Sequence, residues 1–162
     1  MINDRLPEPG LAIVIGPTDP AAVCRKVLEG LPEWFGDPSA IERYALEARN
    51  SPSIALVDDE NEVGFVVLKW HGLETVELHS LGLLREYHRQ GHGRRLLATA
   101  EGYARVNGAK FLTVKTLGPS KQDPAYAATL SFYLAFGFTP LEEFMTLWRE
   151  PPNPCLFLAK AL

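Results

Sequence analysis

The stretch EYHRQGHGRRLL (Glu86–Leu97) decides the fold, because it joins a segment with a strand pattern to one with a helix pattern. Glycines allow an anion to approach the backbone, and the first N–H groups of a helix lack intrahelical partners and lie at its positive dipole end. Four arginines lie within eleven residues of this turn: Arg85, Arg89, Arg94 and Arg95. The turn therefore predicts a polyphosphate site. The alternative is a solvated basic helix start, with glycines that serve only the turn.

Two common phosphate motifs fit this turn poorly. A nucleoside-triphosphate loop requires a lysine followed by a serine or threonine, and the segment has neither. The dinucleotide fingerprint requires a third glycine where Leu96 stands. The residues alone leave the phosphate ligand open.

The segments around the turn predict an α/β (α+β) fold in one domain, residues 1–162. LAIVIG (Leu11–Gly16) is typical of a strand, and helices are expected after Asp19-Pro20, Asp37-Pro38 and Asp123-Pro124, because aspartate caps a helix and proline fits its first turn. Apolar runs between residues 53 and 84 predict an antiparallel meander. The expected order is β, α, α, three β, α, β, α, β, β, with the last two strands forming a hairpin.

Composition indicates an ordinary globular protein. The chain has 162 residues, 46% of them hydrophobic and 22% charged, and its net charge is −4, which argues against disorder and general nucleic-acid binding. The N-terminus lacks a secretory apolar core and no segment is apolar enough to span a membrane, so we expect a cytoplasmic protein without a membrane partner. Cys24 and Cys155 are expected to be small buried hydrophobes. The four histidines lack metal-ligand spacing, so no metal is expected.

With the turn placed between LHSLGLL (Leu78–Leu84) and GRRLLATAEGYA (Gly93–Ala104), the chain resembles the GNAT superfamily of acyl-CoA-dependent N-acetyltransferases. The family's loop, Arg/Gln-x-x-Gly-x-Gly/Ala, is matched apart from His88 in its first position. A second family motif, an aromatic-Tyr pair shortly before Gly-Phe, is matched by FYLAFGF (Phe132–Phe138). The chain departs from this motif at Tyr126, where many members have asparagine, and at Thr129, where a small alanine is usual.

The resemblance implies acetyl-CoA as the acyl donor and a mixed, mostly antiparallel sheet of about six to seven strands with about four helices, in which the central strands splay apart. The backbone at Leu81, Gly82 and Leu83 is expected to pair with the pantetheine amides, and Tyr126 is expected to edge the pantetheine channel. The thioester would lie between strands at Glu77–Leu83 and Phe111–Leu117. The pyrophosphate is expected on the main-chain amides of Arg89, Gln90, Gly91, His92, Gly93 and Arg94.

An acceptor amine must lose a proton before it attacks. A model alkyl amine has a pKa of ~10.4, so presenting it unprotonated at neutral pH costs roughly 4.6 kcal/mol. Glu77 and His79 are two apart on a predicted strand and face the same side, so either can remove the proton directly or through waters. His79 has the better unperturbed pKa for a base. The alternative is a polar pair on a solvated face.

Tyr133 is the predicted general acid, because a phenol can give a proton or a strong hydrogen bond to the departing sulfur. The alternative is a core tyrosine. Trp34 and Phe35, with Tyr44, lie around an aromatic elbow that either walls the acceptor pocket or packs on the domain.

These observations predict an N-acetyltransferase that moves acetyl from acetyl-CoA to a primary amine of a small molecule or peptide. The alternative function is a non-catalytic acyl-CoA-binding sensor or interaction module. The acidic chain mildly favours a cationic acceptor, and the terminal hairpin suggests a homodimer interface.

Overall fold

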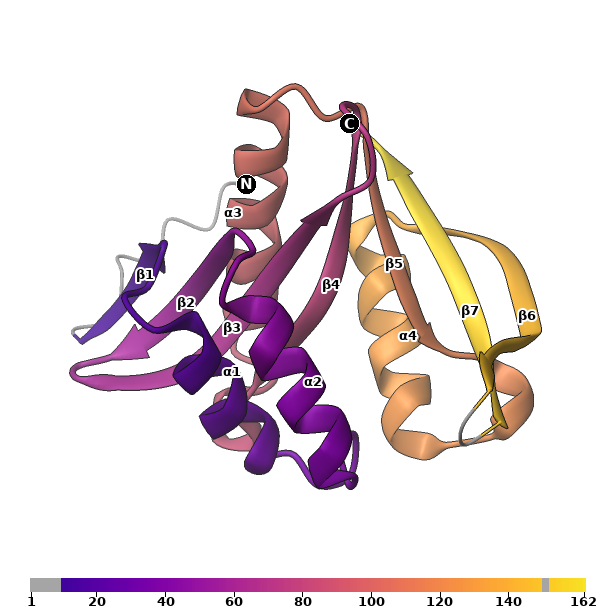
Figure 1. The fold of residues 1–162 in the computed structure, drawn as a ribbon, viewed down its shortest axis with the longest axis horizontal. Coiled ribbons are helices and arrows are strands. Elements are labelled where there is room, and N and C mark those ends of the chain that lie inside the picture. The colour runs from indigo at the N-terminus through magenta and orange to yellow at the C-terminus, as the bar shows by residue number, and fades with distance from the viewer. Residues whose placement is uncertain (1–9, 150–151) are drawn as a thin grey trace. The chain divides into compact units, whose positions relative to one another are not determined.

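The computed structural model describes residues 10–149 and 152–162 (Figure 1). Its helices and strands follow one another in the predicted order. They are β1 (Leu11–Ile15), α1 (Pro20–Glu29), α2 (Pro38–Ala48), β2 (Ser53–Asp58), β3 (Asn61–Trp70), β4 (Thr75–Leu83), α3 (His92–Val106), β5 (Phe111–Leu117), α4 (Pro124–Phe136), β6 (Thr139–Arg149) and β7 (Pro152–Ala161). The seven strands have the order β1-β2-β3-β4-β5-β7-β6, which confirms the expected strand number.

Three helices begin at Asp-Pro pairs, as predicted. The Asp19 carboxylate accepts a hydrogen bond from the Ala22 amide at 3.0 Å, and the Asp37 carboxylate accepts one from the Ser39 amide at 2.9 Å. Asp123 does the same for α4. In each helix the proline is the first residue, where its missing N–H removes no helical bond.

Glycines with positive φ follow the ends of α3 and α4. Gly137 has a φ of +104°, and its amide donates to the Leu134 carbonyl. Gly108, two residues beyond α3, has a φ of +90°. Glycine adopts this conformation without steric cost, so both helices end where the sequence predicts.

The chain forms two compact units, which are described separately. The first combines the described part of Met1–Val67 with Ser80–Thr99, and the second combines Leu68–His79 with Ala100–Leu162. Strands β3 and β4 each contribute residues to both units, because each strand runs across a unit boundary.

The core of the first unit lies between α1, α2 and strands β2 and β3. Val27 and Leu28 of α1 and Phe65 of β3 are buried, as is Ala55 of β2. Cys24 is a free thiol fully buried in the same cluster, which confirms it as a small core residue.

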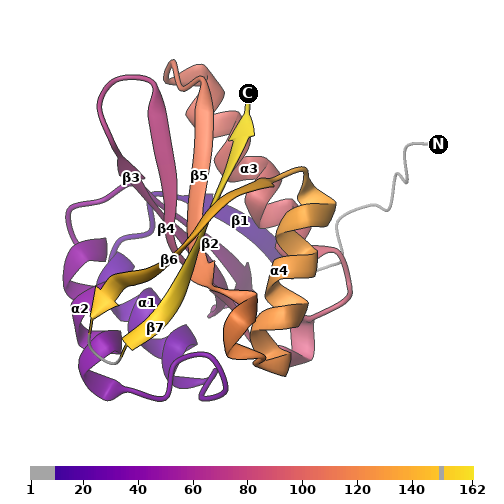
Figure 2. The ribbon, with the colours of Figure 1, turned by 90° about the vertical axis from the view of Figure 1, so that its right-hand side faces the viewer.

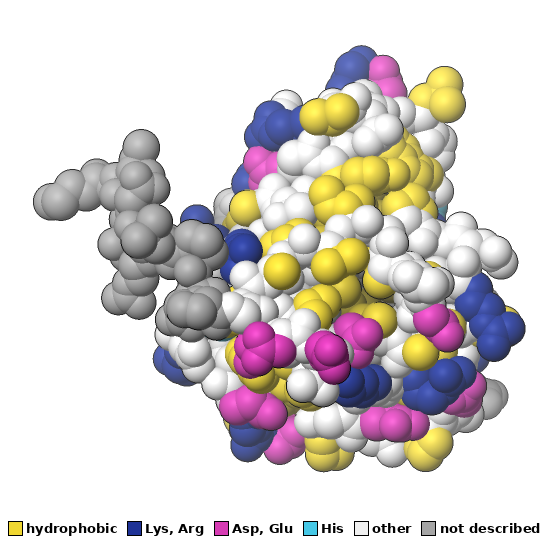
Figure 3. Space-filling view, turned by 90° about the vertical axis from the view of Figure 1, so that its left-hand side faces the viewer, with side chains coloured by type: hydrophobic (Ala, Val, Ile, Leu, Met, Phe, Trp, Pro, Cys, Tyr) yellow, Lys and Arg dark blue, Asp and Glu magenta, His cyan; other side chains and the backbone are white. Residues whose placement is uncertain are grey.

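Strand β1 pairs antiparallel with β2 at the first position of the sheet order. Val14 and Ile15 of β1 are exposed. On the face of the molecule drawn in Figure 3, acidic and basic side chains are interspersed with apolar ones, so this face does not carry a uniformly basic surface.

The second unit contains the parallel pairing of the sheet. Strand β4 pairs parallel with β5 over Thr75–Leu78 and Phe111–Val114, and both strands continue beyond this stretch. Such a short pairing is what central strands that splay apart require. Strand β7 pairs antiparallel with β5 and with β6 (Figure 2), which confirms the predicted C-terminal hairpin.

Among the described residues, no helix has the length and apolar character needed to cross a membrane.

Candidate active site

The second unit contains a buried carboxylate, Glu77, on strand β4. Glu77 is only 5% exposed, and its strand neighbours Val76 and Leu78 are apolar core residues. A buried ionised carboxylate is costly unless it is paired and hydrogen-bonded. Its surroundings therefore decide what Glu77 can do.

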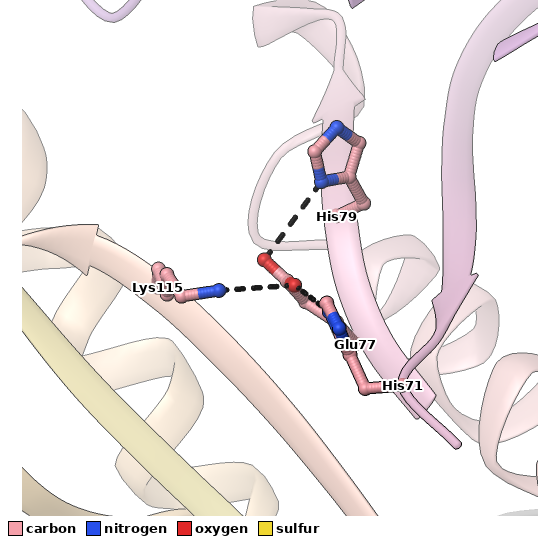
Figure 4. Close-up of polar contacts among 4 residues, drawn as sticks. All are labelled: His71, Glu77, His79 and Lys115. Atoms are coloured by element: carbon pink, nitrogen blue, oxygen red, sulfur yellow. Dashed lines mark hydrogen bonds and ion pairs between the residues drawn. The ribbon is translucent and has the colours of Figure 1, made fainter. Parts of the chain in front are cut away.

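Three side chains surround the Glu77 carboxylate (Figure 4). Its Oε2 is 2.5 Å from Nε2 of His71 and accepts a hydrogen bond from Nζ of Lys115 at 3.1 Å. Its Oε1 faces Nδ1 of His79 at 3.8 Å. We call His71, Glu77, His79 and Lys115 the Glu77 cluster.

These partners keep Glu77 ionised. Burial opposes the charged form, but the nearby His79 ring, the hydrogen bonds from His71 and Lys115 and the Lys115 charge outweigh it and lower the pKa of Glu77 to about 2. At neutral pH the group is a stable anion and a weak proton acceptor. The alternative of a polar pair on a solvated face is wrong, because Glu77 is buried and His79 is largely buried as well.

Sequence reasoning predicted Glu77 and His79 but missed His71 and Lys115. His71 directly follows β3, and its amide donates to the Thr75 carbonyl at the start of β4. Lys115 is the only charged residue of β5. Because Glu77 lies opposite Thr113 in the parallel pairing, Lys115 is two residues further along the same face. A single charged residue in an otherwise uncharged strand was the available signal.

Tyr133, on α4, is 4% exposed. Its ring contacts those of Phe132 and Phe138 at centroid distances of 5.8 and 5.7 Å. Burial raises the pKa of Tyr133, with a smaller contribution from Tyr126. The phenol is therefore protonated at neutral pH and can donate its O–H, although its burial is also that of a core residue. Tyr126, two turns earlier, is half-buried.

The glycine turn lies in the first unit. A short 3-10 helix, Arg85–Tyr87, leads into it, and α3 starts at His92. Arg89 and Gly91 have positive φ values of +57° and +86°. The Arg95 amide donates to the Gly91 carbonyl at 3.0 Å. The amides of residues 92–94 come before this bond in the helix, where amides have no intrahelical acceptor. Amides at the start of a helix are donors that an anion could use, so the anion site stays a prediction.

Side chains of the turn are largely engaged with the first unit itself. Arg85 forms an ion pair with Glu33, and Gln90 donates to the Glu86 carbonyl at 2.7 Å. His88, in the loop's first position, bonds through Nε2 to the Leu83 carbonyl at 2.6 Å. The His92 side chain is buried, and its Nε2 has no hydrogen-bond partner among the described residues. Arg85, His88 and Gln90 are therefore already bonded within the protein, and Arg89, Arg94 and Arg95 are the other basic side chains of the turn.

The expected pantetheine strand has a packing role at Gly82. A Cβ there would come within 3.0 Å of Val27 Cγ1 and 3.1 Å of Leu31 Cδ1. A larger residue at position 82 would therefore fit only if these core side chains shifted by a few tenths of an ångström. Leu81 and Leu83 are half-buried.

Trp34 and Phe35 pack partly against the core of the first unit. Trp34 contacts the His88 ring edge-on at 5.8 Å, and Phe35 contacts the Tyr44 ring at 5.9 Å. These contacts are those of the packing alternative. A role of Trp34 and Phe35 in acceptor binding stays a prediction.

No group of metal-ligating side chains that could hold an ion occurs within residues 10–149 and 152–162. The donor set at the Glu77 cluster, with a lysine on the carboxylate, is also not one that a metal site would use.

Comparisons with known proteins agree with this architecture. A GNAT-family protein from Desulfovibrio desulfuricans superposes with a TM-score of 0.77 at 20% identity, covering 93% of this chain and 98% of that one. An Elizabethkingia anophelis GNAT family acetyltransferase with acetyl-CoA bound gives 0.72 at 16% identity, covering 96% and 100%. An aminoglycoside 6'-N-acetyltransferase complexed with coenzyme A gives 0.72 at 17% identity, covering 93% and 96%.

These structural likenesses show the fold alone, and no curated protein matches the sequence. The sequence model described as the acetyltransferase (GNAT) family matches residues 22–138, which include the Glu77 cluster, the glycine turn and Tyr133. This match covers well over half of the 162 residues. The chain therefore belongs to the GNAT family of acetyltransferases, a family of acyltransferases.

Proposed function

We propose that residues 1–162 act as one N-acetyltransferase domain that moves an acetyl group from acetyl-CoA to a primary amine. The observation that carries this proposal is the buried, ionised Glu77 carboxylate beside His79 on β4. Family membership and the coenzyme A found in structures of two similar proteins support acetyl-CoA as the donor.

His79 is the proposed general base, and Glu77 is its positioning residue. With a pKa of about 2, Glu77 is too weak a base to take a proton from an ammonium group. A carboxylate only accepts hydrogen bonds, so it favours the His79 tautomer with hydrogen on Nδ1 and leaves the Nε2 lone pair to accept a proton. The second ring nitrogen points away from Glu77 (Figure 4). Glu77 then stabilises the imidazolium that forms.

The neutral amine attacks the thioester carbonyl carbon and forms a tetrahedral intermediate. Collapse of this intermediate breaks the carbon–sulfur bond, and the amine nitrogen gives its remaining extra proton to solvent water. We assign Tyr133 as the O–H donor to the departing sulfur. Because burial raises the pKa of the phenol, its contribution is a hydrogen bond that stabilises the developing thiolate, with the final proton supplied from solvent.

We assign the binding of acetyl-CoA, the acyl donor, to main-chain groups. The amides of Arg89–Arg94 at the start of α3 hold the pyrophosphate, supported by the positive end of the helix. We assign the pantetheine amides to main-chain groups of Leu81–Leu83. The Leu83 carbonyl already accepts from His88, so we expect it to contribute least.

The test is thiol release from acetyl-CoA with a broad panel of primary amines, together with calorimetry of coenzyme A binding. We expect saturable coenzyme A binding and amine-dependent thiol release, with the acetylated amine identified by mass. Binding without release across the panel would instead support the sensor or interaction module. A folded sample that shows neither result contradicts both functions.

A further inference from the structure

The charge balance of the Glu77 cluster bears on the acceptor. Glu77 is its one carboxylate, and Oε2 is engaged by both His71 and Lys115. The remaining members are cationic or neutral bases. A second cation brought to the cluster, as by a polyamine, would therefore meet the Lys115 ammonium without an unpaired carboxylate to balance it.

The side-chain ammonium of Lys115 is a cation that is held in place and is partly accessible. Its ammonium has three N–H donors, of which one is directed to Glu77. The Phe157 ring, which lies opposite in the β5–β7 register, has its centroid 5.9 Å from Nζ. The Lys115 side chain is still 31% exposed. A ligand can thus reach the ammonium while Glu77 and Phe157 keep it in place.

His79 and Lys115 lie on the same face of neighbouring strands. Glu77 is opposite Thr113 in the parallel pairing, and His79 and Lys115 are each two residues further along. Both contact the same carboxylate, His79 through Oε1 and Lys115 through Oε2. The proposed base, His79, and the Lys115 ammonium, which can bind an anion, therefore lie on either side of the Glu77 carboxylate.

We propose that Lys115 binds a carboxylate of the acceptor, so that the acceptor is an amino acid or another amine that carries a carboxylate close to its amino group. This inference rests on the proposed function, because His79 marks where the amine must lie. A charge-assisted hydrogen bond to the Lys115 ammonium anchors the carboxylate and orients the neighbouring amine toward His79.

A purely structural role of Lys115 would have a different signature. If Lys115 only holds Glu77 in position, its replacement lowers turnover of every acceptor by the same factor. If Lys115 binds the acceptor carboxylate, its replacement changes the preference between acceptors. The ratio of kcat/KM for matched acceptors separates the two roles.

The experiment compares amino acids with their decarboxylated amines: histidine with histamine, tryptophan with tryptamine, and phenylalanine with phenethylamine. We expect the wild type to favour at least one carboxylated member by about tenfold or more in kcat/KM, as a charge-assisted bond allows. Lys115→Met should bring that ratio close to one, and Lys115→Arg should retain most of it. Lys110→Met is the control, because Lys110 is an exposed lysine of the same unit, paired with Glu74.

Two results overturn the inference while acetyl transfer stands. One is a wild type that shows no preference for the carboxylated acceptors or prefers the decarboxylated ones, and the other is a kcat/KM ratio that Lys115→Met leaves unchanged. If coenzyme A binds but no amine is acetylated, the proposed function fails instead. Calorimetry with N-acetylhistidine and N-acetylhistamine, in the presence of coenzyme A, then decides the inference. Tighter binding of the carboxylated compound that is lost in Lys115→Met supports it, and the absence of such a difference overturns it.

Discussion

The glycine turn and the Glu77 cluster are built in opposite ways. The turn is contiguous in sequence, between Arg85 and Arg95, and offers main-chain amides fixed by two positive-φ residues and a helix start. The cluster gathers side chains from His71 to Lys115, which come from β4, β5 and the segment after β3. The turn therefore depends on backbone conformation, whereas the cluster depends on strand register and on every side chain in it.

This difference predicts where each region is fragile. Substituting a side chain in the turn leaves its amides in place, but a change of backbone conformation does not. In the cluster, one substitution removes a partner from a buried carboxylate.

The largest effect is expected for His79→Ala. Removing the proposed general base should lower kcat by about 10²- to 10⁴-fold, with the affinity for coenzyme A nearly unchanged. Steady-state thiol release and calorimetry measure the two quantities. Turnover close to wild type would exclude His79 as the base, and a parallel loss of coenzyme A binding would indicate a structural defect.

Glu77 should make stability depend on pH in the acid range. Its pKa is lowered from 4.5 to about 2 in the folded protein, so its stabilising contribution is complete above pH 4.5 and is lost as pH falls toward 2. Between pH 5 and pH 3, the unfolding free energy of the wild type should fall by about 2 kcal/mol more than that of Glu77→Gln. Urea unfolding at each pH measures it, and parallel pH dependences in the two proteins would contradict the buried anion.

Tyr133→Phe keeps the ring and removes only the hydroxyl. Loss of a hydrogen bond to a developing thiolate should lower kcat by about tenfold to a hundredfold, while coenzyme A binds as before. Tyr103→Phe on α3 is the matched control and should leave kcat unchanged. Equal rates in Tyr133→Phe and wild type would leave Tyr133 as a core residue only.

Two glycines near opposite ends of α3 provide the smallest and most direct backbone test. Gly91 has a φ of +86° with open space around its Cβ position, so Gly91→Ala should cost about 1 kcal/mol through backbone strain and weaken coenzyme A binding. Gly102 is exposed within the helix, so Gly102→Ala should instead stabilise by roughly 0.5–1 kcal/mol. Thermal and urea unfolding compare them, and shifts of the same sign would contradict the assigned backbone conformations.

The same contrast explains what the sequence could predict. The helix starts at Asp19, Asp37 and Asp123 and the end of α4 at Gly137 follow from neighbouring residues, so local rules predict them. The turn is equally local. The role of Lys115 depends on the β4–β5 register, which no local pattern specifies.

Burial was similarly hidden from the sequence. Glu77 and His79 alternate with apolar residues, a pattern shared by a solvated face and by a buried polar cluster. The cluster forms because Lys115 and His71 compensate the carboxylate, and that compensation is visible only once the strands are paired. Trp34 and Phe35 are a further case, since the sequence left open whether the aromatic elbow walls a pocket or packs on the domain, and both residues pack partly against the core.

The central claim is that the chain uses coenzyme A, held by main-chain amides at the start of α3. Calorimetric titration of coenzyme A into the wild-type protein, with its folded state verified by circular dichroism on the same sample, tests this most directly. We expect saturable heat at a single site. A folded sample that takes up no coenzyme A at millimolar ligand would contradict it.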